Sequence, residues 1–214
     1  MILQRPFAVI TPTVDGDVLQ SLAPVDAEFT PPELHRLVGS RSEAGIRLSL
    51  ERLSSQGIVI RRRVGAAWTY RLNREHLAAA PITELAQLRE RFLERLRGLI
   101  SRWEVRSEYA ALFGSAARGT MDLGSDLDIF VVRPRHVDAS DVHWSVQRLE
   151  LVTQVRSWTG NDVNVLEYGA DDTAGALTSD DAVLNDIKRQ GIRLFGPHDY
   201  LRSSAGQEVL RHRG

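Results

Sequence analysis

Two aspartates, Asp126 and Asp128, stand two positions apart where an apolar run begins. The run from 127 to 132 is rich in β-branched residues and predicts a strand. Because successive side chains of a strand point to opposite faces, both carboxylates are expected on one face. Neighbouring carboxylates repel each other unless a positive charge lies between them. The pair is therefore a candidate site for a divalent cation, Mg²⁺ or Mn²⁺.

A Gly-Ser turn, Gly114-Ser115, precedes the aspartates and follows a short apolar segment. Glycine tolerates the backbone dihedral angles that turn successive N–H groups into one hollow, so this turn could bind an anion. An anion-binding turn beside a metal-binding carboxylate pair is suited to a nucleoside triphosphate.

The order and spacing of these residues resemble the signature of the DNA-polymerase-β-like nucleotidyltransferase superfamily in its minimal form. That signature stands here as Gly114-Ser115, Arg118-Gly119 and Ser125-Asp126-Leu127-Asp128, followed by the hydrophobic strand. The resemblance covers about residues 106–200. It implies a C-terminal fold with a small mixed sheet flanked by helices.

The resemblance also implies an enzyme that transfers a nucleoside monophosphate from an NTP to an acceptor and releases pyrophosphate. The acceptor stays open between a protein hydroxyl, a tRNA end and a small molecule. Arg118 would support either the phosphates or the turn itself. The implied nucleotide-binding residues are Gly114, Ser115, Arg118 and Ser125, and the implied catalytic metal ligands are Asp126 and Asp128.

A third metal-facing carboxylate is expected from the family, on the strand after a long helix. The candidates are Asp162, Asn164 and Glu167. Alternation along a strand puts Asp162 and Asn164 on one face and Glu167 on the other. We predict that Asp162 is the third catalytic and metal-binding acid. If Asn164 holds the position instead, an acid is missing and catalysis suffers, because an amide cannot take a proton.

The N-terminal region has the pattern of a winged helix-turn-helix. Helices are predicted from Thr30 to Gly39 and from Ser42 to Gly57, followed by a hairpin that turns at Gly65. In that fold the later helix enters the major groove of DNA and the hairpin contacts the backbone. The alternative is a solvated face on a protein-binding module. The predicted DNA-binding residues are Arg41, Ser42, Arg47, Arg61, Arg62 and Arg63.

A long helical pattern from Pro81 to about Glu104 separates the two regions. Its apolar stripe either joins two copies into a homodimer or packs on one or both domains. We therefore predict an α+β protein whose domains follow one another along the chain. They are a winged helix-turn-helix at 1–80, a linker helix at 81–105, the nucleotidyltransferase domain at 106–200 and a polar tail at 201–214.

Composition limits the classes that remain. The chain has 214 residues, 43% hydrophobic residues and no cysteine, which excludes disulfides and cysteine-ligated zinc. Neither a signal peptide nor an apolar run of membrane-spanning length is evident, so we predict a cytoplasmic protein with no membrane partner. Arginines outnumber acidic residues in residues 31–80, whereas acidic residues outnumber basic ones in residues 107–214. This asymmetry indicates two modules with different partners.

Two functions fit these observations. The first is an Mg²⁺- or Mn²⁺-dependent nucleotidyltransferase coupled to a DNA-binding module. The second is a DNA-binding transcriptional regulator whose C-terminal domain only binds a nucleotide as a signal.

Overall fold

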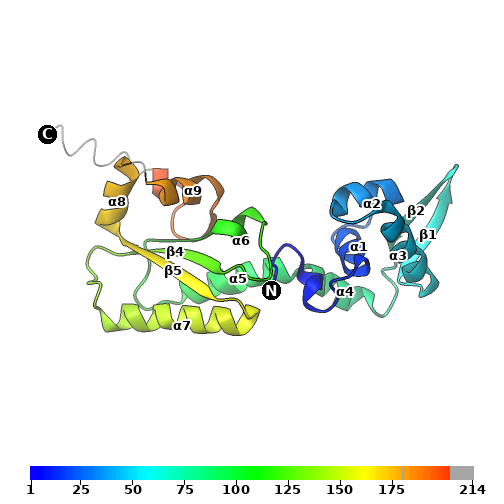
Figure 1. The fold of residues 1–214 in the computed structure, drawn as a ribbon. Coiled ribbons are helices and arrows are strands. Elements are labelled where there is room, and N and C mark those ends of the chain that lie inside the picture. Colours follow the sequence, from blue (N-terminus) through cyan, green and yellow to red (C-terminus); the bar gives the residue numbers. More distant parts are fainter. Residues whose placement is uncertain (180, 203–214) are drawn as a thin grey trace. The chain divides into compact units, whose positions relative to one another are not determined.

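The computed structural model describes residues 1–179 and 181–202. The chain divides into two compact units, Met1–Arg91 and Phe92–Gly214 (Figure 1). In the described part of the chain, no helix has the length and apolar character needed to cross a bilayer.

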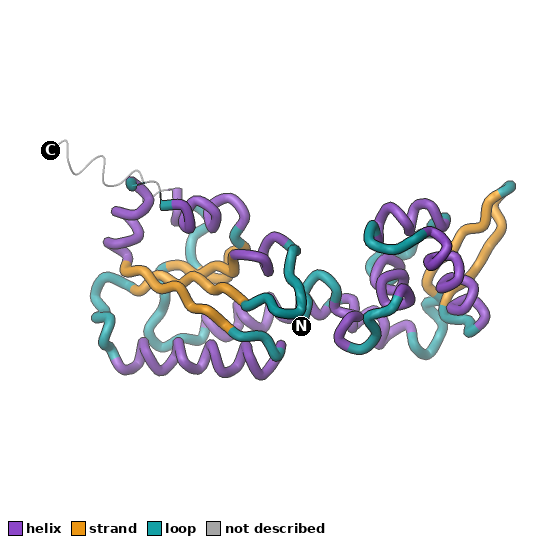
Figure 2. The backbone as a smooth tube through the Cα atoms, viewed as in Figure 1, coloured by secondary structure: helices purple, strands orange, loops and turns teal. Residues whose placement is uncertain are grey.

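The first unit consists of short helices and a projecting β-hairpin (Figure 2). Residues Phe29 and Tyr70 exchange two backbone hydrogen bonds of 2.9 and 2.8 Å, which add a single bridge beside the hairpin. The elements in chain order are a 3₁₀ helix Pro6–Val9, α1 Val14–Leu22, α2 Pro31–Val38, α3 Glu43–Ser55, β1 Val59–Val64, β2 Ala67–Leu72 and α4 Ala79–Ala86.

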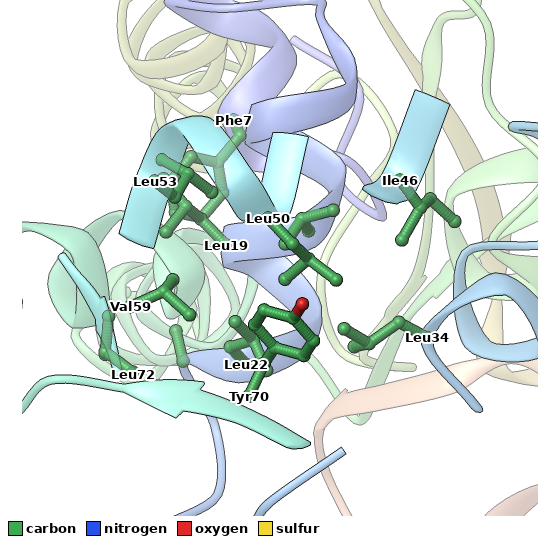
Figure 3. Packing of buried hydrophobic residues seen from close by; sticks show 12 residues of the cluster. Phe7, Leu19, Leu22, Leu34, Ile46, Leu50, Leu53, Val59, Tyr70 and Leu72 are labelled. Carbon is green, nitrogen blue, oxygen red and sulfur yellow. The ribbon is translucent and has the colours of Figure 1, made fainter. Parts of the chain in front are cut away.

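The helices of this unit share one apolar core with the base of the hairpin. Ile46, Leu50 and Leu53 lie on one stripe of α3 and are fully buried or nearly so. Figure 3 shows Leu34 of α2 close to the ring of Tyr70 from β2. Burying a side chain of this size contributes about 1.5–3 kcal/mol. The core therefore fixes the hairpin against α3.

The start of α2 is held by a reciprocal cap. Thr30 and Glu33 form a capping box, in which the Thr30 N–H donates to the Glu33 carboxylate at 2.7 Å. The hydrogen bonds from the Thr30 backbone and hydroxyl hold the pKa of Glu33 below its ordinary value. A depressed carboxyl pKa means that the ionised form stabilises the folded unit. That contribution is present above the unfolded pKa and is lost as the pH falls through the folded pKa.

The helical pattern from 81 to about 104 is not one helix. The structure contains α4, which ends at Ala86, and α5, Leu88–Ser101, with an interruption at Gln87. The Gln87 N–H lies 3.2 Å from the carbonyls of both Thr83 and Glu84, so the last turn of α4 tightens. Glutamine is a good helix former, and the apolar spacing continues across it, so the sequence carries no stop signal there.

The second unit is built on a mixed sheet with the strand order β5-β4-β3-β6. Among the described strands of this sheet, only β4 and β5 run parallel, and α7 forms the crossover between them. Helices flank the sheet, with α7 on one face and α8 and α9 on the other (Figure 1). The elements in chain order are β3 Tyr109–Phe113, α6 Gly114–Arg118, β4 Leu127–Arg133, α7 Val142–Thr159, β5 Val163–Gly169, α8 Ala170–Thr178, α9 Ala182–Gln190 and β6 Ile192–Phe195. This architecture confirms the prediction of a small mixed sheet flanked by helices.

The two central strands are the most buried part of this unit. Ala110–Leu112 of β3 and Ile129–Val132 of β4 are fully buried. A strand buried on both faces reads as a continuous apolar run, which is the pattern that follows Asp128. The rigid centre of the sheet therefore ends at the point where the aspartates begin.

The capping box of α2 makes a testable contribution to stability. Replacing Thr30 with Ala removes the hydroxyl that donates to the Glu33 carboxylate at 2.7 Å. We expect a loss of about 1 kcal/mol in the free energy of unfolding, measured by urea denaturation of the full chain at neutral pH.

Thr13→Ala is the matched control, because Thr13 stands before α1 but its side chain makes no capping hydrogen bond. We expect a change below about 0.5 kcal/mol for this variant. Equal losses in the two variants would contradict the assigned role of the capping box.

Candidate active site

The register of the sheet brings three segments to one end of it. Phe113, the last residue of β3, pairs with Asp128 in antiparallel register. Asp128 in turn pairs with Asn164 in parallel register. The turn that follows β3, the start of β4 and the start of β5 therefore meet at one end of the sheet.

Gly114 passes directly beside Asp128. Its φ is +66°, a conformation that residues with a Cβ rarely adopt. A Cβ added here would lie 2.3 Å from the Oδ2 atom of Asp128. Glycine is therefore required at this position for two reasons. The backbone has a positive φ, and the turn approaches the carboxylate too closely to leave room for a Cβ.

The two aspartates converge on the side chain of Asn164. Its Nδ2 atom donates to Oδ2 of Asp126 at 3.1 Å and to Oδ1 of Asp128 at 3.2 Å. Asp126 and Asn164 are solvent-exposed and Asp128 is half-buried, so the cluster is accessible from outside. Among the described residues, neither aspartate forms an ion pair with a Lys, Arg or His side chain.

The donor set of this cluster fits a divalent metal ion. Two carboxylates that point at one place, beside a turn with no Cβ, offer the hard oxygen ligands that Mg²⁺ and Mn²⁺ prefer. Asp126 and Asp128 would hold the ion. Asn164 could contribute only through its amide oxygen. No group of three or more His, Cys, Asp or Glu side chains gathers at a potential metal site in the part of the chain that the structure describes.

The structure does not bring Asp162 into this cluster. Asp162 lies just before β5, and its carboxylate is 3.4 Å from the guanidinium of Arg156 with 69% of the side chain exposed. Glu167, the candidate on the opposite face, lies between Arg133 and Arg148 at 2.8 and 2.6 Å. The place opposite the two aspartates is taken by Asn164. Alternation alone could not separate Asp162 from Asn164, because both point to the same side of the strand.

Ser125 and Arg118 make contacts within the protein. The Ser125 hydroxyl donates to Asp122 Oδ1 at 3.0 Å and accepts from the Asp122 N–H at 2.9 Å, which closes the loop before β4. Arg118 lies at the end of α6 and pairs with Asp186 of α9 at 2.8 Å. Of the two roles considered for Arg118, this ion pair favours support of the turn.

Two positioning residues were missed by the sequence reasoning. Asn161 is buried and donates through Nδ2 to the carbonyl of Ser125 at 2.9 Å, which holds the segment before Asp126. Asp186 fixes Arg118 from another helix. In the sequence, the Gly-Asn pair at 160–161 predicts only a turn before a strand. The residues around Asp186 give no sign that it pairs with Arg118. Both roles depend on contacts between residues far apart in the chain.

The candidate DNA-binding residues near α3 are largely engaged within the first unit. Arg41 donates to Asp17 at 2.7 Å and to the carbonyl of Pro12 at 2.9 Å. Ser42 caps α3 by accepting from the Gly45 N–H. Arg47 pairs with Glu43 one turn earlier at 2.6 Å. Much of the positive charge around this helix is therefore offset by acids of the same unit.

The hairpin arginines differ from one another. Arg62 pairs with Glu28 at 3.0 Å, and the pKa of Glu28 is lowered by a hydrogen bond from Thr69 and by the nearby Arg62. Arg61 lies over the Trp68 ring, 3.8 Å from its centroid, and Trp68 is 41% exposed. In the described chain no acid forms an ion pair with Arg61 or Arg63. Arg63 is directly opposite Trp68, so these three side chains share one face of the hairpin.

The comparison with protein families agrees with the geometry at the end of the sheet. Residues 89–171 match a family model described as nucleotidyltransferase domain. The matched segment contains the Gly-Ser turn, both aspartates and Asn164. Over this segment the chain is similar to that family.

No curated protein matches the chain. Among solved structures, a toxin–antitoxin complex with AMP-PNP is 22% identical, with a TM-score of 0.38 over 56% of this chain and 86% of that one. A mutant of the MntA–HpeT toxin–antitoxin is 18% identical, with the same coverage and a TM-score of 0.38. At these values the likeness carries no conclusion about function.

The close approach of Gly114 to Asp128 predicts a specific effect of mutation. Gly114→Ala forces a Cβ against the Asp128 carboxylate, so the turn and the carboxylate must move apart. We expect nucleotide affinity, measured by equilibrium dialysis with Mg²⁺ and ATP, to fall by at least about tenfold, the equivalent of about 1.4 kcal/mol.

Gly160→Ala is the matched control, because Gly160 has a φ of +73° with nothing within 4 Å of an added Cβ. This variant carries the same backbone cost, about 1 kcal/mol of stability, without the clash. Unchanged nucleotide affinity in Gly114→Ala, or an equal loss in Gly160→Ala, would show that the close approach does not matter.

Proposed function

We propose that the protein is a metal-dependent nucleotidyltransferase that transfers a nucleoside monophosphate from an NTP to an acceptor hydroxyl. One observation carries this proposal. Asp126 and Asp128 converge on one point beside the Gly114-Ser115 turn, inside the segment that matches a nucleotidyltransferase domain.

The proposed reaction forms a bond between the acceptor oxygen and the α-phosphorus of the NTP. The bond from that phosphorus to the oxygen bridging the β-phosphorus breaks, and pyrophosphate leaves. A bound divalent cation supplies positive charge to the phosphate oxygens. The Gly114-Ser115 turn binds the phosphates, Asp126 and Asp128 bind the cation, and the ion pair between Arg118 and Asp186 keeps α6 in position.

The acceptor is a protein hydroxyl, a tRNA end or a small molecule. Its hydroxyl proton must leave during the transfer, and a side chain that accepts it has to be a base. Asn164 occupies the place opposite the aspartates, and an amide cannot accept that proton. The proton therefore passes to Asp128, Asp126 or solvent, and we expect slow turnover.

The enzyme hypothesis is tested by label transfer. Full-length protein is incubated with Mg²⁺ and α-labelled NTPs, with and without cell extract. We expect metal-dependent incorporation of label, and a loss of at least about a hundredfold in Asp126→Asn/Asp128→Asn, because both proposed cation ligands lose their charge.

Glu150→Gln removes one exposed carboxylate from α7 and serves as the charge control. Its rate should equal that of the wild-type protein. Nucleotide binding without transfer to any acceptor would reject the enzyme.

A second candidate function is favoured by Asn164. With an amide in place of a third acid, the domain can bind a nucleotide and still turn it over poorly. In that case the C-terminal unit is the nucleotide-sensing part of a DNA-binding transcriptional regulator. The same label-transfer experiment separates the two functions, since the regulator binds nucleotide and transfers none.

We further propose that the first unit is a winged helix-turn-helix that binds DNA mainly through its hairpin. Arg61 and Arg63 lie on one face with the half-exposed Trp68, and the described acids of the unit pair with neither arginine. By contrast, Arg41 and Arg47 are paired within the unit. Arginines without an acid partner are the ones that can neutralise phosphates at no cost to an existing ion pair.

The hairpin proposal predicts a difference in salt dependence. Binding of the full chain to a mixed-sequence DNA duplex is measured by fluorescence anisotropy at several salt concentrations. In Arg61→Gln/Arg63→Gln the slope of log K against log salt should fall by about 1.8, since each phosphate contact contributes about 0.9.

Arg62→Gln is the matched variant on the same strand, and it should change the slope less because Arg62 already pairs with Glu28. A wild-type protein that fails to bind DNA at low salt would remove the DNA-binding proposal altogether.

A further inference from the structure

The number of metal ions at the proposed site depends on Asn164. This inference rests on the proposed function, because it concerns the cation and nucleotide that the site would bind. The key observation is the register: Asn164 of β5 lies directly opposite Asp128 of β4 and hydrogen-bonds to both aspartates. The strand position nearest to the carboxylate pair thus holds a neutral side chain.

The other acids around the cluster are committed elsewhere. Asp162 pairs with Arg156, Glu167 with Arg133 and Arg148, and Asp186 with Arg118. Asp122 accepts hydrogen bonds from Ser125 and from the Gly124 N–H inside its own loop. Among the described residues, the cluster therefore carries two negative charges, those of Asp126 and Asp128.

Two carboxylates suffice for one divalent cation that also binds phosphate oxygens. Mg²⁺ is commonly bound in this way, through one or two carboxylates and the substrate phosphates. A second ion in the same site would place another double positive charge close to the first. It would need further carboxylate charge from the protein, and an amide oxygen supplies none.

We propose that Asn164 makes this a site for a single divalent cation, which the two aspartates share with the phosphates of the nucleotide. The Asn164 amide also has a role before the cation binds. It donates to both carboxylates and so holds two like charges close together without a positive ion between them. Replacing it with a carboxylate would place three negative charges together and create the ligand set for a second ion.

The experiment counts bound ions. Mn²⁺ is titrated into the full-length protein saturated with an α,β-methylene NTP analogue, which cannot be cleaved, and free Mn²⁺ is followed by electron paramagnetic resonance. Ions bound to the analogue alone are counted in a protein-free titration. We expect one Mn²⁺ per wild-type chain and two per Asn164→Asp chain. A second Mn²⁺ should bind the wild-type protein on the order of a hundredfold more weakly than it binds the Asn164→Asp variant.

A thermal-stability readout accompanies the count. Without metal, Asn164→Asp should melt below the wild-type protein because its three carboxylates repel one another. Adding Mn²⁺ and the analogue should raise the Tm of Asn164→Asp by more than it raises the Tm of the wild-type protein. Gln190→Glu, which adds an exposed acid at the end of α9, is the control and should bind one ion with an unchanged gain in Tm.

Each outcome is decisive for one proposal. Two ions in the wild-type protein, or one ion in a folded Asn164→Asp variant, would overturn the role assigned to Asn164 and leave the proposed function standing. A wild-type protein that binds neither Mn²⁺ nor the analogue would refute the proposed function itself. If Asn164→Asp does not fold, the wild-type count still tests the proposal.

Discussion

The candidate site of the C-terminal unit depends on holding two carboxylates close together. Asp126 and Asp128 carry like charges, and a single amide group from the neighbouring strand donates to both. That contact needs β4 and β5 in parallel register, and the register needs the α7 crossover and the buried centre of the sheet. The apolar core of this unit is thus what fixes the polar geometry at its end.

A second constraint comes from the turn after β3. Gly114 must adopt a positive φ and leave room for the Asp128 carboxylate, so the turn that we propose binds phosphate and the carboxylates that we propose bind the cation are positioned against each other. Longer-range contacts hold their surroundings. Asn161 fixes the segment before Asp126, and Asp186 fixes Arg118 at the end of α6. Such preorganised supports allow a site to bind charged groups without first rearranging.

The N-terminal unit shows that basic composition and basic surface differ. Arg41 and Arg47 pair with acids of their own unit, and so does Arg62 of the hairpin. Arg61 and Arg63, together with the half-exposed Trp68, form the face whose positive charge is not offset in this way. The arginines that form no ion pair with an acid are therefore the better basis for proposing a DNA contact. Net charge alone would have given every arginine equal weight.

The sequence by itself determined the features that depend on neighbours in the chain. The Gly-Ser turn, the Ser-Asp-x-Asp segment with its apolar run, the capping box and the hairpin each carry a local pattern. The candidate pair of Asp126 and Asp128 followed from these patterns, and the mixed sheet with flanking helices followed from the family resemblance of the first two. The tertiary structure alone placed the Asn164 side chain, and not that of Asp162, beside the two aspartates, paired Arg118 with Asp186, and ended α4 at Ala86. Strand alternation gives the face of a residue but not its partner across the sheet. Which side chains finally meet is set by register and packing between distant segments, and no local pattern records these.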